Sequence, residues 1–126
     1  MTYLHKDLTG SIIGAAMVVH NEIGHGLREK TYENGLCVEL GIQKIRFGKQ
    51  SRYPVFYRDV QIDEFIPDMV VDERVIVENK VVESITDEHV GQVMNYLRIT
   101  GLEVGLILNF RHPRLEYKRV ILQTAR

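Results

Sequence analysis

The chain has 126 residues, of which 44% are hydrophobic, and a formal net charge of −1 at pH 7. This length suits one domain with a real core, here residues 1–126, and the near-neutral charge argues against a strongly basic nucleic-acid-binding surface. The sequence has no signal-peptide pattern and no apolar run long enough to span a membrane. The single Cys37 excludes an internal disulfide and a cysteine-rich zinc site. We therefore expect a soluble, cytoplasmic protein.

The first predicted helix runs from about residue 7 to residue 23, with Thr9 or Ser11 able to cap its start. His20 falls on its apolar stripe, where a histidine is more often a hydrogen-bonded core residue than a ligand. A direct role for His20 stays open. The positions of this helix that we expect to be buried are Ile12, Ile13, Ala16, Met17 and Ile23.

The second predicted helix covers about residues 27–40, after the break at Gly24, His25 and Gly26, and Gly41 ends it. Glu29 lies on one face of this helix, three or four residues apart from the inward positions Tyr32, Leu36 and Leu40. Glu29 is therefore expected on the inward stripe. The alternative is a surface carboxylate in the first turn, favoured by the helix dipole.

The rest of the chain alternates between strands and one more helix. Strands around residues 42–47, 53–57, 60–71 and 75–84 predict an antiparallel meander. A helix over about 86–100, a buried strand over 104–110 and a last strand over 117–122 follow. This order predicts an α/β domain with a mixed central sheet flanked by helices.

Two carboxylates and a lysine interrupt an apolar hairpin. Glu78 and Lys80 share one face of a strand that is otherwise apolar on both faces. If residues 72–74 form a three-residue loop, Asp68 lies directly opposite Glu78, with Cβ atoms about 4.5 to 5.5 Å apart. Two carboxylates at that distance can hold one cation. The alternative is a Glu78–Lys80 ion pair at a strand end, which a second buried negative charge at Asp68 disfavours.

A second Glu-x-Lys occurs at Glu116 and Lys118, but no acidic residue precedes it in a partner strand. We expect it on a surface strand.

Charged residues are segregated along the chain. Residues 41–58 carry five bases and no acid, residues 59–90 carry ten acids and two bases, and residues 91–126 carry six bases and two acids. An acidic, metal-binding centre between basic arms would attract a phosphate backbone. Ordinary solvated faces are the alternative.

Asp68, Glu78-x-Lys80 and the later Gln92-x-x-x-Tyr96 resemble, in order and spacing, the PD-(D/E)XK nuclease superfamily and its RecB-like branch. The resemblance implies a restriction-endonuclease-like fold and metal-dependent cleavage of phosphodiester bonds in DNA or RNA. Lys80 would hold or help deprotonate the attacking water. Gln92 and Tyr96 would position the substrate or support the acidic cluster.

The spacing of Gly26, Glu29 and Tyr32 resembles the motif of small bacterial proteins called the GxxExxY family, and the similarity runs over about residues 8–121. The resemblance to these proteins and to the superfamily implies a metal site for Mg²⁺ or Mn²⁺, whose ligands would be Asp68, Glu78 and the backbone carbonyl of Asn79, with Glu29 completing or orienting the shell. Relatives more often have an apolar residue in place of Asn79.

A second function is open to the same residues. A catalytically inactive descendant could keep the acidic pocket for stability or for a metal and act as a homodimer or as a module that binds a protein partner. The candidate catalytic residues favour the nuclease, whereas the short chain, in which we expect no separate substrate-binding domain, favours the binding module.

Overall fold

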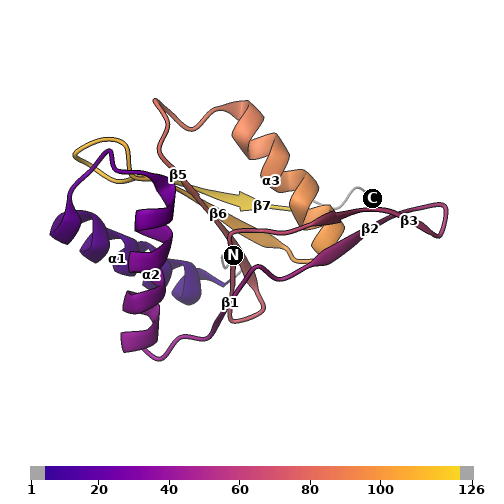
Figure 1. Cartoon of the computed structure of the whole chain (residues 1–126), viewed down its shortest axis with the longest axis horizontal. Coiled ribbons are helices and arrows are strands. Elements are labelled where there is room, and N and C mark those ends of the chain that lie inside the picture. The colour runs from indigo at the N-terminus through magenta and orange to yellow at the C-terminus, as the bar shows by residue number, and fades with distance from the viewer. Residues whose placement is uncertain (1–4, 123–126) are drawn as a thin grey trace.

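The computed structural model describes residues 5–122. Its elements in chain order are α1 (Lys6–Ile23), α2 (Glu29–Ile42), β1 (Phe47–Lys49), β2 (Tyr53–Tyr57), β3 (Val60–Phe65), β4 (Met69–Val71), β5 (Val75–Lys80), α3 (Asp87–Thr100), β6 (Val104–Asn109) and β7 (Glu116–Ile121). Five strands form a mixed sheet in the order β1-β4-β5-β6-β7. Figure 1 shows α1 and α2 on one side of this sheet and α3 on the other. The predicted α/β class with a flanked mixed sheet is confirmed.

The side chains of β4, β5 and β6 alternate between two apolar layers. One layer joins Val71, Val75 and Val77 to the helices α1 and α2. The other joins Ile76 to α3. Because strand side chains alternate, Glu78 lies on the same face as Ile76, as predicted, and the structure shows that this face is the one toward α3. Within residues 5–122, no helix has the length and apolarity that crossing a membrane requires.

The predicted antiparallel meander is wrong. The expected strand over residues 60–71 is two strands, since β3 pairs with β2 in a separate two-stranded sheet while β4 pairs with β1 and β5. Pro67 lies at the break and has no N–H to donate to a ladder. The expected strand over 42–47 is also wrong, because Ile42 ends α2 and β1 begins at Phe47. β5 ends at Lys80, and β6 lies parallel to it after the crossover through α3.

The predicted caps of the first helix are also wrong. His5 precedes α1 and makes no side-chain cap bond. Thr9 lies inside the helix, where its hydroxyl donates to the Lys6 carbonyl at 3.1 Å, and Ser11 is exposed further along. A threonine hydroxyl bonded back to the preceding turn cannot cap the helix start.

Burial along α1 follows a stripe that differs in part from the predicted one. Ile12 and Ala16 are buried and Ile13 is partly buried, whereas Met17 and Ile23 are exposed. The buried stripe continues instead through Ala15, Val19 and His20. The His20 ring nitrogen Nε2 lies 2.7 Å from the backbone carbonyl oxygen of His112, which confirms a hydrogen-bonded core histidine.

The β2–β3 hairpin extends away from the five-stranded sheet, beyond α3 (Figure 1). Its tip residues Arg58 and Asp59 both have positive φ, as in the tight turns that match the twist of a hairpin. Near the base, the Phe65 ring stacks on the Tyr96 ring of α3 with a centroid distance of 3.7 Å. The hairpin is therefore anchored to α3 at one end and exposed at the other.

Candidate metal and nucleic-acid site

Asp68 and Glu78 face each other at the open end of the β4–β5 hairpin. The pairing of Met69 with Val77 places the preceding Asp68 opposite Glu78, which is the predicted register. The Asp68 N–H donates to Glu78 Oε2 at 3.2 Å, and the Asn79 N–H donates to Asp68 Oδ2 at 3.0 Å. Each carboxylate thus accepts a hydrogen bond from a backbone N–H of the opposite segment, next to the pair of Met69 and Val77.

The Glu78 carboxyl has a strongly perturbed affinity for protons. Burial, and then the negative charge of Asp68, raises its pKa to about 7, while the hydrogen bond from the Asp68 N–H and the charge of Lys80 oppose the rise. The charge of Glu29 adds a smaller upward contribution. A raised pKa on a buried acid beside a second carboxylate is typical of functional sites.

Lys80 lies at the last position of β5, on the face of Glu78, and is half-buried. No ion pair joins Lys80 to a carboxylate among residues 5–122. The Glu78–Lys80 ion pair considered above is therefore not formed, although the lysine is near enough to lower the Glu78 pKa. Its ammonium can interact with a water or phosphate beside the carboxylates.

Glu29 reaches the site from the first turn of α2. Its Oε2 accepts the Val81 N–H at 3.2 Å, directly after Lys80. Two contacts with Phe110 hold the start of this helix. The Gly26 N–H donates to the Phe110 carbonyl at 3.0 Å, and the Tyr32 ring stacks on the Phe110 ring with a centroid distance of 4.3 Å. Gly26, Glu29 and Tyr32 together tie the start of α2 to the ends of β5 and β6. Glu29 is exposed, but its carboxylate accepts a backbone hydrogen bond. Its position therefore matches neither the predicted inward carboxylate nor the alternative, a free surface carboxylate.

Tyr96 lies beside the carboxylate pair, on α3. Burial, and then the charges of Glu78 and Asp68, raises the pKa of its hydroxyl. Stacking on Phe65 fixes its ring. Gln92 lies one helical turn earlier and is exposed, and within the described part of the chain its side chain makes no hydrogen bond. The structure thus places the Tyr96 hydroxyl in the electrostatic field of the acids.

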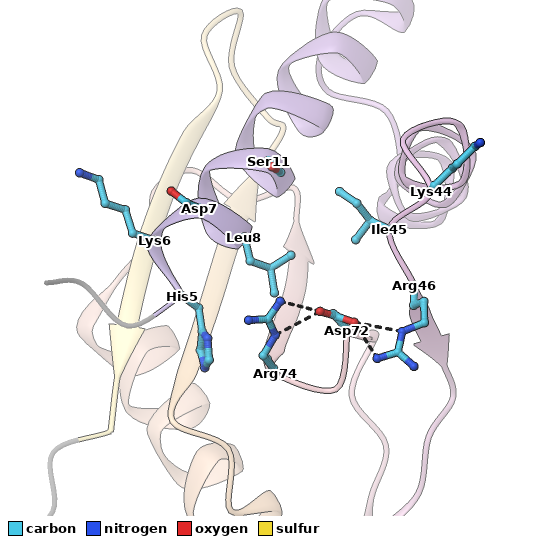
Figure 2. Close-up of a pocket in the computed structure, with 10 residues that line it drawn as sticks. All are labelled: His5, Lys6, Asp7, Leu8, Ser11, Lys44, Ile45, Arg46, Asp72 and Arg74. Carbon is cyan, nitrogen blue, oxygen red and sulfur yellow. Dashed lines mark hydrogen bonds and ion pairs between the residues drawn. The ribbon is translucent and has the colours of Figure 1, made fainter.

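A separate cavity of about 1170 Å³ lies at the other end of the β4–β5 hairpin (Figure 2). In Figure 2 the Asp72 carboxylate lies between the Arg46 and Arg74 guanidiniums and accepts hydrogen bonds from both. These bonds, from Arg74 first, hold the pKa of Asp72 below its usual range. Because none of the residues that line this cavity belongs to the carboxylate site, we assign the cavity no part in it.

The comparison with protein families decides what the chain is related to. The sequence profile of the PD-(D/E)XK nuclease superfamily matches residues 6–120. The chain belongs to this superfamily. The crystal structure of SSO0001 superposes with a TM-score of 0.58 at 14% identity, over 96% of this chain and 60% of that one, which shows a shared fold. The chain thus spans 60% of the length of SSO0001, and a comparison with curated proteins finds no match.

PD-(D/E)XK nucleases typically use divalent metals, and the donor set of the hairpin fits such an ion. Mg²⁺ is commonly bound by one or two carboxylates together with waters and substrate phosphates, which suits Asp68 and Glu78. The Asn79 N–H faces Asp68, and a strand residue directs its N–H and C=O to the same side, so the Asn79 carbonyl faces Asp68 too. Among residues 5–122, no three His, Cys, Asp or Glu gather closely enough to hold a metal, so Glu29 does not join the pair as a third clustered carboxylate.

One buried polar residue at the end of the sheet where Asp68 and Glu78 lie is not predicted from the sequence. Asn109 is fully buried at the end of β6, and its side chain bonds the Glu116 carboxylate at 2.8 Å. β7 is an exposed edge strand, as predicted for residues around Lys118, but Glu116 is half-buried. A lone asparagine ending an otherwise apolar strand was the available signal.

Proposed function

We propose that this PD-(D/E)XK protein is a hydrolase that cleaves phosphodiester bonds of DNA or RNA with Mg²⁺ or Mn²⁺. The observation that carries the proposal is the opposed Asp68–Glu78 pair, with Lys80 two residues along on the same face and one acid titrating near neutral pH. A buried acid whose pKa is near neutral can exchange its proton for a cation.

Each residue of the site has an assigned role. Asp68, Glu78 and the Asn79 carbonyl would hold the cation, and Glu29 would orient the segment beside it, since its carboxylate accepts the Val81 N–H. When bound, the cation polarises the phosphate and stabilises the leaving oxygen. Lys80 would hold the attacking water through its ammonium group, whose positive charge favours loss of the water proton to bulk solvent.

Two residues of α3 contact the substrate. The Tyr96 hydroxyl stays protonated beside the two acids, because its pKa is raised, and can donate to a phosphate oxygen. Gln92, exposed one turn earlier, contacts the nucleic acid as it approaches.

We also assign the chain to the bacterial GxxExxY family, as a single domain over residues 1–126. The support is that Gly26, Glu29 and Tyr32 all contact the ends of β5 and β6.

The second candidate is an inactive module that binds a second copy or another protein. Exposed apolar side chains on the β2–β3 hairpin favour it: Phe56, Tyr57, Val60 and Ile62. Apolar groups gathered on a projecting hairpin are typical of contact surfaces.

The deciding experiment is a cleavage assay on single- and double-stranded DNA and RNA, with Mg²⁺, Mn²⁺ or a chelator. The wild type is compared with Lys80→Ala and with the control Glu103→Gln, an exposed carboxylate at the far end of the sheet. Metal-dependent cleavage lost only in Lys80→Ala supports the nuclease. No cleavage of any substrate, with light scattering showing a dimer, supports the binding module instead.

A further inference from the structure

The segment after Lys80 leaves the backbone ladder of the sheet but remains held by side chains. The Val82 N–H donates to Asn109 Oδ1 at 3.0 Å, and Asn109 Nδ2 donates to the Val82 carbonyl at 2.9 Å. The side-chain amide of Asn109 therefore pairs with Val82 as a neighbouring strand would. Because Val82 offers one donor and one acceptor, the amide can bind it in only one orientation.

Glu116 secures that amide from the far side. Its Oε1 accepts the second N–H of Asn109 Nδ2 at 2.8 Å, and its Oε2 accepts the Ile85 N–H at 3.4 Å. One carboxylate thus connects the buried amide to the segment that leads into α3. An apolar residue at position 109 would fill the core but leave the Val82 backbone and the Glu116 carboxylate without these partners.

The held segment lies between two parts of the candidate site. Lys80 immediately precedes it, with its carbonyl bound to the Phe110 N–H at 2.9 Å, and α3 with Tyr96 immediately follows it. Glu29 takes the intervening Val81 N–H. Among residues 5–122, Asn109 is the one group whose side chain binds both polar atoms of the Val82 backbone, so it sets where this segment runs after Lys80.

We propose that Asn109 and Glu116 are positioning residues for the nuclease reaction, fixing Lys80 and α3 relative to the Asp68–Glu78 pair without touching substrate. This inference rests on the proposed function. Groups that orient a reacting side chain from behind commonly change turnover about 10- to 100-fold when removed.

The sharpest variant is Asn109→Asp, which keeps the shape but replaces the amide donor by a carboxylate oxygen facing Val82 O and Glu116. We expect kcat to fall about 10- to 100-fold, with KM and the Kd for Mn²⁺ changed by less than about twofold. Adding Glu116→Gln supplies a donor toward the new carboxylate, and we expect it to recover part of kcat. Glu103→Gln, which removes an exposed charge elsewhere, should match the wild type.

Amide hydrogen exchange gives a readout that needs no turnover. In Asn109→Asp the Val82 and Ile85 amides should exchange faster, while amides of β4 remain protected. If Asn109→Asp does not fold, Glu116→Ala on the edge strand serves the same test with the same expected direction.

The outcomes separate this inference from the proposed function. An active wild type, faster exchange at Val82 and an unchanged kcat in the variant would overturn the positioning role alone. A parallel loss of Mn²⁺ binding and kcat would also overturn it, since the acids and not Lys80 would then be displaced. A wild type without any cleavage would overturn both proposals.

Discussion

Asp68 and Glu78 are bound crosswise: the Asp68 N–H donates to Glu78 Oε2, and the N–H that follows Glu78 donates to Asp68 Oδ2. Each carboxylate uses one oxygen in this way. Among the described residues, neither Asp68 Oδ1 nor Glu78 Oε1 accepts a hydrogen bond. The hairpin therefore leaves one oxygen of each acid without a hydrogen bond and available to the cation that we propose.

Asp68→Asn should abolish stabilisation by Mn²⁺ but keep the fold, because its side-chain oxygen can still accept the Asn79 N–H. A ligand at 100 times its Kd stabilises the folded state by about 2.7 kcal/mol, so the wild type should melt several degrees higher with Mn²⁺. Calorimetric titration measures the binding, and Asp59→Asn at the hairpin tip is the control. Equal Mn²⁺ affinity in wild type and Asp68→Asn would mean that the ion binds elsewhere.

The raised pKa of Glu78 gives the metal-free protein a defined pH dependence. The ordinary pKa is 4.5 and the folded value is about 7, so between these values the folded state binds more protons than the unfolded state. The free energy of unfolding should therefore fall as pH rises from 4.5 to 7, by roughly 3 kcal/mol from this group. Urea unfolding at pH 5 and pH 8 with a chelator, in wild type and Glu78→Gln, isolates this contribution. Parallel pH profiles for the two proteins would contradict it.

Lys80→Ala should leave the metal-bound protein folded, since Lys80 makes no ion pair with the acids in the described structure. Cleavage should fall roughly a hundredfold or more, a typical size for the loss of a positioned acid-base or electrostatic group. A lysine needed only as a counter-charge would instead lose about 3 to 5 kcal/mol of stability. Melting temperature and rate are measured together, with the exposed Lys118→Ala as control. A collapsed fold with a metal present would identify Lys80 as structural.

Glu29→Gln should weaken Mn²⁺ binding or turnover about tenfold while the fold stays intact. Glutamine retains an oxygen that can accept the Val81 N–H, so the substitution removes charge without removing the contact. The matched control is Glu88→Gln, which alters an exposed carboxylate in the first turn of α3. If both variants behave as the wild type does in titration and cleavage assays, Glu29 serves only to anchor the start of α2.

Local patterns in the sequence predict some elements and contacts well. The Asp68–Glu78 register follows from loop length and strand parity alone. The start and end of α3 follow from Thr86, which caps the helix through His89, and from Gly101 in the left-handed conformation. These features depend on residues that are close to one another in the sequence, so the residue types and their spacing are enough to predict them.

The features that the sequence does not predict depend on distant partners. β1 pairs with β4 across the whole β2–β3 hairpin, and no local pattern distinguishes this from a meander. Glu29 accepts a hydrogen bond from Val81, 52 positions away, and Asn109 accepts one from Val82, 27 positions away. Such contacts are set by how the layers pack, and single-sequence periodicity does not specify them.

The β2–β3 hairpin leaves and re-enters the fold between two strands that pair with each other, β1 and β4. Lengthening its Arg58–Asp59 tip would therefore add loop without shifting the register of either acid, at a small entropic cost. The contacts of this arm could thus change while the Asp68–Glu78 pair stays in place. Natural variants of this fold should differ most in length at the tip, and grafting a binding loop there is a practical way to retarget the protein.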